Sequence, residues 1–131
     1  MSEANLAVVQ AVYDAFALRD PITIQANFSE DVVVHQVGDI PWGGEYHGHE
    51  GMLTFLLRLV EHIDSELTLL DRFAAGDQVV QTGRTRGKVK STGKTFDIPI
   101  VHIWTIRDGL ATRYEAYIDV PAMQVALTPS P

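Results

Sequence analysis

The sequence predicts an α+β fold in which three N-terminal helices pack on one face of a curved, mostly antiparallel sheet. Two observations predict it. Apolar residues recur at intervals of three and four up to residue 63, which is typical of helices that bury one face. From residue 65 onward, long strand-like segments alternate with short turn sequences. Helices followed by a run of antiparallel strands favour the α+β class. Such a sheet forms a cone with an internal pocket, where a small ligand would bind.

Three helices are predicted before residue 65, over residues 3–19, 21–28 and 49–63. Asp20 and Pro21 separate the first two, because Asp caps a helix N-terminus and Pro fits the first helical position. The first helix carries an apolar stripe that consists of Leu6, Val9, Tyr13 and Phe16.

Five strands are predicted, over residues 31–37, 66–75, 78–90, 95–106 and 110–119. Three consecutive valines at 32–34 disfavour a helix, and Asp108-Gly109 is a typical two-residue hairpin turn. A glycine-bearing loop over 38–48 connects the first strand to the third helix. Residues 1–121 are therefore expected to form a single domain, and 122–131 a frayed C-terminal tail.

The composition excludes several classes of protein. Seventeen acidic residues against ten basic ones give a net charge of −7, which opposes binding to nucleic acid or anionic lipid. No apolar run approaches the ~18–20 residues that a membrane span needs. The chain has no cysteine, which removes thiol catalysis and thiolate zinc sites. With an N-terminus that lacks the basic start of a signal peptide, these features predict a cytoplasmic protein.

Four segments carry a resemblance to a known family: 31–35 (DVVVH), 41–51 (PWGGEYHGHEG), 103–109 (IWTIRDG) and 113–119 (RYEAYID). In this order of elements, the chain resembles the nuclear transport factor 2-like superfamily, and more narrowly its SnoaL-like polyketide cyclase and ketosteroid isomerase group. The resemblance covers nearly the whole chain. It implies the cone-shaped fold, a homodimer formed through the sheet, and proton-transfer chemistry that needs no cofactor.

The resemblance also assigns positions to the family's functional groups. The oxyanion-stabilising tyrosine of the isomerases falls on Val12, and their second oxyanion group, an aspartate, falls on Val101. The isomerase base falls on His35 or Gln36, and the acid/base aspartate of the cyclases falls on Ala116. The family's acids are thus replaced in this sequence, so the resemblance leaves open whether the chain is an enzyme.

The hairpin around Asp108-Gly109 predicts which residues share a face of the sheet. If the two strands pair without a bulge, Val101 lies opposite Ala116 on the face toward the helices. The other face then carries aromatic and charged groups, which predict a dimer interface. His102 beside Glu115 is interpreted as an interface pair, with a catalytic pair as the alternative. The predicted interface residues are His102, Trp104, Arg113, Glu115 and Tyr117.

The predicted site consists of a base and an apolar pocket. His35 is the candidate catalytic base, because a neutral imidazole accepts a proton near pH 7. Gln36 is its competitor for the inward position. The pattern His47-x-His49-Glu50 lacks the further ligands that a metal site requires, so no metal is expected. The candidate ligand-binding residues are Tyr13, Phe16, Phe28, Gln36, Trp42, Tyr46, Phe55, Val101, Tyr114 and Ala116.

Two functions follow from the sequence. In the first, a homodimer binds a small apolar organic molecule and acts as a cofactor-independent isomerase or cyclase, with His35 as base and Tyr46 or Tyr13 as hydrogen-bond donor. In the second, the same fold is a non-catalytic ligand-binding or interaction module. The replaced acids at Val12, Val101 and Ala116 favour the second function.

Overall fold

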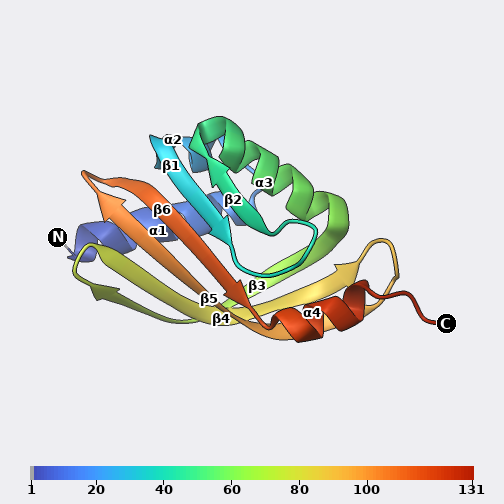
Figure 1. Cartoon of the computed structure of the whole chain (residues 1–131). Coiled ribbons are helices and arrows are strands. Elements are labelled where there is room, and N and C mark those ends of the chain that lie inside the picture. Colours follow the sequence, from blue (N-terminus) through green and yellow to red (C-terminus); the bar gives the residue numbers. More distant parts are fainter. Residues whose placement is uncertain (1) are drawn as a thin grey trace.

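The computed structural model describes residues 2–131, which form helices on one side of a curved sheet (Figure 1). Within this range the helices are α1 Ser2–Ala17, α2 Pro21–Ala26, α3 Gly48–His62 and α4 Val120–Leu127. The strands are β1 Phe28–Gln36, β2 Gly44–His47, β3 Ile63–Ala75, β4 Gln78–Val89, β5 Thr95–Arg107 and β6 Leu110–Ile118.

The six strands of the described chain form one open sheet in the order β2-β1-β6-β5-β4-β3. Neighbouring strands are antiparallel except β1 and β6, which run parallel. The helices α1 and α3 lie against the concave face, where they cover the core (Figure 1). The predicted fold class is confirmed. None of the helices in residues 2–131 combines the length and apolar character that crossing a membrane requires.

Local chemistry explains the start of α2. The Asp20 side chain accepts a hydrogen bond from the backbone N–H of Thr23, and Pro21 is the first residue of α2, as the sequence predicts. The expected loop over 38–48 contains a short strand, β2, which pairs with the end of β1.

The chain after residue 120 is not the frayed tail that the sequence suggests. Asp119 caps α4 by accepting a hydrogen bond from the N–H of Ala122. Met123 of this helix is fully buried, and Thr92 Oγ1 donates to the carbonyl of Ala126 at 2.7 Å. The helix forms because burial of its apolar side chains and the Asp119 cap outweigh the fraying expected at a chain end.

A bulge changes the predicted register of the last hairpin. Arg107 pairs with Leu110 as expected, but the register shifts after Ile106, so Thr105 pairs with Arg113 and Thr112 has no partner. β5 alternates without interruption and faces the side opposite to the predicted one along its whole length, whereas Tyr114 and Ala116 of β6 keep their predicted side. This shift decides which side chains of β5 enter the core.

Glycines on β4 let β3 curve over the concave face. Gly83 and Gly87 lie opposite Leu69 and Ser65 of β3. A Cβ atom at Gly87 would lie 2.8 Å from the Cα of Ser65, and even nearer to the preceding carbonyl. Only glycine permits this approach of two backbones. The curvature leaves space between the sheet and the helices.

Candidate functional site

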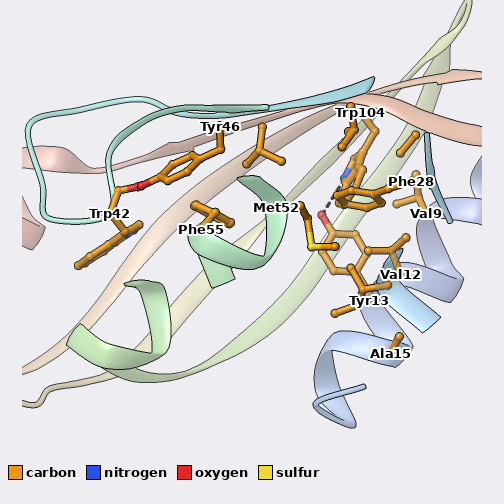
Figure 2. Packing of buried hydrophobic residues seen from close by; sticks show 14 of the residues in the cluster. Val9, Val12, Tyr13, Ala15, Phe28, Trp42, Tyr46, Met52, Phe55 and Trp104 are labelled. Atoms are coloured by element: carbon orange, nitrogen blue, oxygen red, sulfur yellow. Dashed lines mark hydrogen bonds between the residues drawn. The ribbon is translucent and has the colours of Figure 1, made fainter. Parts of the chain in front are cut away.

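A cavity of about 90 Å³ lies between the concave face of the sheet and the helices. Its wall is mostly aliphatic and aromatic, and among the described residues that line it none is Asp, Glu, Lys or Arg. Figure 2 shows part of this packing, with Trp42 and Phe55 on one side, Tyr13, Phe28 and Trp104 on the other, and Met52 between them. A cavity of this kind favours an uncharged, largely apolar molecule.

Three side chains form a hydrogen-bonded group at one end of the cavity. Tyr13 comes from α1, whereas His102 and Trp104 come from β5. The Tyr13 hydroxyl lies 2.7 Å from His102 Nδ1, and Trp104 Nε1 donates to the same hydroxyl at 3.0 Å (Figure 2 shows the second bond). The Tyr13 ring stacks on the imidazole and meets the indole edge-on. All three residues are buried.

This group is uncharged at neutral pH. Burial lowers the pKa of His102 from 6.5 to about 3, because the imidazolium would lose its hydration. Burial likewise raises the pKa of Tyr13 and of Tyr114 well above the usual value of 10.0. The Arg72 guanidinium, 5.5 Å from the centroid of the Tyr13 ring, opposes this rise only in part.

The hydrogen bonds favour one tautomer of His102. The indole N–H can only donate, so the Tyr13 hydroxyl accepts from Trp104. Among the described residues the other neighbour of that hydroxyl is His102 Nδ1 at 2.7 Å, so the hydroxyl proton forms a hydrogen bond only when Nδ1 is the acceptor. A neutral imidazole whose Nδ1 accepts carries its proton on Nε2. Within residues 2–131, His102 Nε2 has no hydrogen-bond partner, so this N–H is available to a ligand.

Polar side chains form one row across the concave face. The register places Gln36 beside Ala116, Ala116 beside His102, His102 beside Gln81, and Gln81 beside Arg72. Gln36 and His102 line the cavity, whereas Arg72 binds Gln81 through Nε at 2.6 Å outside it. The charged end of the row is thus separated from the cavity.

Rows of apolar side chains lie on both sides of this polar row. One has two aromatic residues between two valines, the other is aliphatic apart from a glycine, and each continues over four strands. The first contains Val34, Tyr114, Trp104 and Val79, and the second contains Ile118, Ile100, Gly83 and Leu69. On the sheet wall, Gln36 and His102 thus lie between two apolar rows, while Ser65 of β3 and Thr85 of β4 line the cavity outside this polar row.

Gln36 is held so that its amide oxygen is free. Its Nε2 lies 3.1 Å from the carbonyl oxygen of Val37 and 3.4 Å from that of Ala116. Two carbonyl neighbours require the NH₂ end of the amide at this position. Gln36 Oε1 accepts no hydrogen bond from any residue in 2–131. The residue is buried, so this oxygen is an acceptor inside the protein.

Most of the predicted pocket residues line the cavity. They are Tyr13, Phe16, Phe28, Gln36, Trp42, Phe55 and Tyr114. Tyr46 and Ala116 are buried but do not reach it. The Tyr46 hydroxyl donates to the carbonyl of Trp42 at 2.9 Å, which fixes the loop before β2. The prediction that Val101 faces the pocket is wrong, because the bulge turns it to the outer face, where it is 36% exposed.

His35, the predicted base, lies outside the cavity. Strand alternation turns Gln36 inward and His35 to the outer face, where it pairs with Glu45 of β2 and Glu115 of β6. The structure thus separates His35 from Tyr13 and the other cavity residues. Gln36 occupies the inward position that the sequence analysis left open between the two.

His102 and Trp104 are not at a surface interface, which corrects the prediction made for both. The bulge turns them inward, so His102 pairs with Ala116 and does not meet Glu115. Sequence reasoning therefore missed the hydrogen-bonded group of the cavity. The alternation of β5 indicates that His102 and Trp104 share a face, but not which face that is.

The other predicted interface residues do lie on the outer face. Arg113 Nε is 3.4 Å from a Glu115 carboxylate oxygen, and Tyr117 donates to Glu115 at 2.9 Å. In the His47-x-His49-Glu50 segment, His49 Nε2 lies 2.8 Å from the carbonyl oxygen of Phe28, and His47 is exposed. Within residues 2–131, no three His, Asp or Glu side chains are grouped as metal ligands would be.

Comparison with known proteins agrees with this architecture. A family model described as SnoaL-like domain matches residues 9–114. A structure of TerC co-crystallised with polyporic acid is 30% identical, covers 95% of this chain and 98% of its own, and has a TM-score of 0.87. A nuclear transport factor 2-like protein of unknown function from Burkholderia pseudomallei K96243 is 26% identical, with coverages of 95% and 98% and a TM-score of 0.89.

A more distant structure shows the same fold. It belongs to a protein of Jannaschia sp. CCS1 described as a candidate SnoaL-like polyketide cyclase. It is 18% identical, with coverages of 100% and 96% and a TM-score of 0.89. No functionally curated protein matches the sequence.

Proposed function

We propose that this chain, which belongs to the SnoaL-like domain family, binds a small, uncharged, largely apolar organic molecule in the cavity. The observation that carries this proposal is an apolar cavity of about 90 Å³ that holds a neutral, hydrogen-bonded Tyr13–His102 pair. Apolar walls supply affinity, and a few placed polar groups fix the orientation of a ligand. The size of the cavity favours a single ring over an extended molecule.

The relatives support binding of this kind. TerC, at 30% identity, was co-crystallised with polyporic acid, which is an organic ligand on the same fold. The cavity of this chain differs from an anion site, because no cationic side chain lines it among the described residues. A carboxylate in such a wall would lose its hydration without a compensating charge.

Filling the cavity should weaken binding of a single-ring probe. Ile100 is buried and lines the cavity, so Ile100→Phe places an aromatic ring in that space. We expect toluene to bind the wild-type protein and to bind Ile100→Phe at least about tenfold more weakly, since loss of about 1.4 kcal/mol of contact is a factor of ten. Tryptophan fluorescence measures this directly, because Trp42 and Trp104 both line the cavity.

The matched control is Val101→Phe, which adds the same ring to the next residue of β5 on the outer face. It should bind toluene as the wild type does. Failure of toluene to bind the wild type, or equal binding by Ile100→Phe, would contradict the proposal.

A second candidate function is catalysis without a cofactor. The observation that favours it is the His102 Nε2–H, a neutral donor fixed by Tyr13 inside an apolar cavity. A preorganised donor stabilises the negative oxygen of an enolate as it forms. Cyclases and isomerases pass through such states, and turnover that disappears in His102→Gln would distinguish this function from binding alone.

We also propose that the chain forms a homodimer through the outer face of the sheet. One row across this face joins apolar Phe73, Val80 and Ile103 to polar Glu115 and His35. Phe73 is 52% exposed, which is unfavourable for a single chain in water. The Arg113–Glu115 ion pair of the neighbouring strand adds charges of both signs, as a self-complementary interface requires.

A charge at the centre of this face should separate the two copies. Ile103→Asp brings two carboxylates together across the twofold axis, so we expect light scattering to give the mass of one chain for the variant and twice that mass for the wild type. Leu57→Asp is the control, because Leu57 is 67% exposed on α3, away from the sheet. A single-chain mass for the wild type would refute this assembly.

A further inference from the structure

Two polar side chains that line the cavity, Gln36 and His102, are suited to one kind of ligand group. Gln36 and His102 lie in the same row, with Ala116 between them. Adjacent strands are about 4.8 Å apart, so the two backbones are separated by about 10 Å. Both side chains line the cavity, whereas the intervening Ala116 has only a methyl side chain that does not reach it.

The two side chains offer opposite hydrogen-bonding roles. The NH₂ of Gln36 is engaged by two backbone carbonyls, so Gln36 presents only an acceptor, Oε1. His102 Nδ1 accepts from Tyr13, so His102 presents only a donor, Nε2–H. A ligand group that satisfies both must donate one hydrogen bond and accept another. A hydroxyl does so, whereas a ketone, an ether or a carboxylate only accepts.

We propose that Gln36 and His102 form a hydroxyl-binding pair, so the ligand of this cavity is an alcohol, phenol or enol on an apolar frame. This inference rests on the proposed binding function and adds the chemical class of the ligand. An acceptor-only ligand leaves Gln36 Oε1 buried without a partner, which costs affinity. An apolar ligand of the same shape leaves both side chains without partners.

Three single-ring probes of similar size test the pair in the wild-type protein. Phenol donates and accepts, anisole only accepts, and toluene does neither. Titration calorimetry at pH 7 should give phenol a Kd about tenfold lower than that of anisole, since one unmade buried hydrogen bond has roughly that effect. Toluene should bind more weakly than phenol by a similar or larger factor.

Variants then assign the effect to named atoms. In Gln36→Leu the preference for phenol over anisole should disappear while toluene binding persists. His35→Ala is the matched control, because His35 is the preceding residue on the outer face, and it should keep the full preference. The comparison of probes in the wild type needs no variant, so it remains decisive if Gln36→Leu does not fold.

The outcomes separate the two proposals. Equal affinity for phenol, anisole and toluene would overturn the hydroxyl-binding pair and leave the apolar cavity intact. Equal affinity for phenol and anisole, with weaker binding of toluene, would overturn the role of Gln36. An unchanged preference for phenol over anisole in Gln36→Leu would do the same. Absence of binding by all three probes would overturn the binding function and this inference with it.

Discussion

Acidification from pH 6.5 to pH 4.5 should cost the wild-type protein about 2 kcal/mol of stability that a His102→Gln variant does not lose. The imidazole is buried, and its pKa falls from 6.5 to about 3 in the folded protein. Between these values the unfolded chain binds a proton at His102 and the folded chain does not. The free energy of unfolding therefore falls as the pH falls through this window, by up to about 1.4 kcal/mol per pH unit, and this contribution is constant above pH 6.5.

Urea denaturation at a series of pH values measures this effect. Carboxylates also titrate toward the acid end, so the informative quantity is the difference between the wild type and His102→Gln. The control His35→Ala leaves His102 in place and should follow the wild-type curve. Parallel curves for the wild type and His102→Gln would show that His102 is not buried as described.

Removal of the Tyr13 hydroxyl should destabilise the protein by about 3 kcal/mol, because Tyr13→Phe leaves two buried polar groups without partners. Trp104 Nε1–H loses its acceptor and His102 Nδ1 loses its donor, while the aromatic packing of the ring remains. The two orphaned groups cost more than the lost hydrogen bonds alone, since neither regains water in the folded state.

Thermal and urea unfolding of Tyr13→Phe measure the cost. The matched control is Tyr117→Phe, which removes a hydroxyl that bonds Glu115 on the partly exposed outer face. We expect a change within about 0.5 kcal/mol for that surface substitution. A loss of unfolding free energy below about 1 kcal/mol in Tyr13→Phe would mean that a water molecule replaces the hydroxyl. His102 and Trp104 would then be accessible to water.

The order of the helices and strands other than β2 and α4 was predictable from the sequence, because these elements carry local signals. Periodic apolar residues indicate α1 and α3, Asp20-Pro21 begins α2, and Asp108-Gly109 begins β6. These signals depend on a residue and its near neighbours. Part of the aromatic wall of the cavity followed from the same periodicity, as Tyr13 and Phe55 illustrate.

The polar part of the site was not predictable in the same way. A single unpaired residue, Thr112, reverses the faces of β5 relative to β6 and turns His102 and Trp104 inward. A bulge inserts one extra residue into one strand, and the alternation of either strand alone does not show where. His102 and Trp104 then bond Tyr13 of α1, which precedes them in the chain by 89 and 91 positions. The sequence analysis also missed α4, although its start carries the signals that mark α2, the cap Asp119 and a proline in the first turn.

In the structure described above, His102 lies in the cavity as a neutral hydrogen-bond donor that Tyr13 holds in place. Nitrogen-15 NMR of the histidine side chains tests it most directly, because the shifts distinguish a protonated ring nitrogen from a bare one. We expect the signals of one histidine with a proton on Nε2 and none on Nδ1. These signals should not change from pH 7.5 to pH 4.5, and they should be absent from the spectrum of His102→Gln. A His102 that gains a second proton near pH 6.5, or that carries its proton on Nδ1, would contradict it.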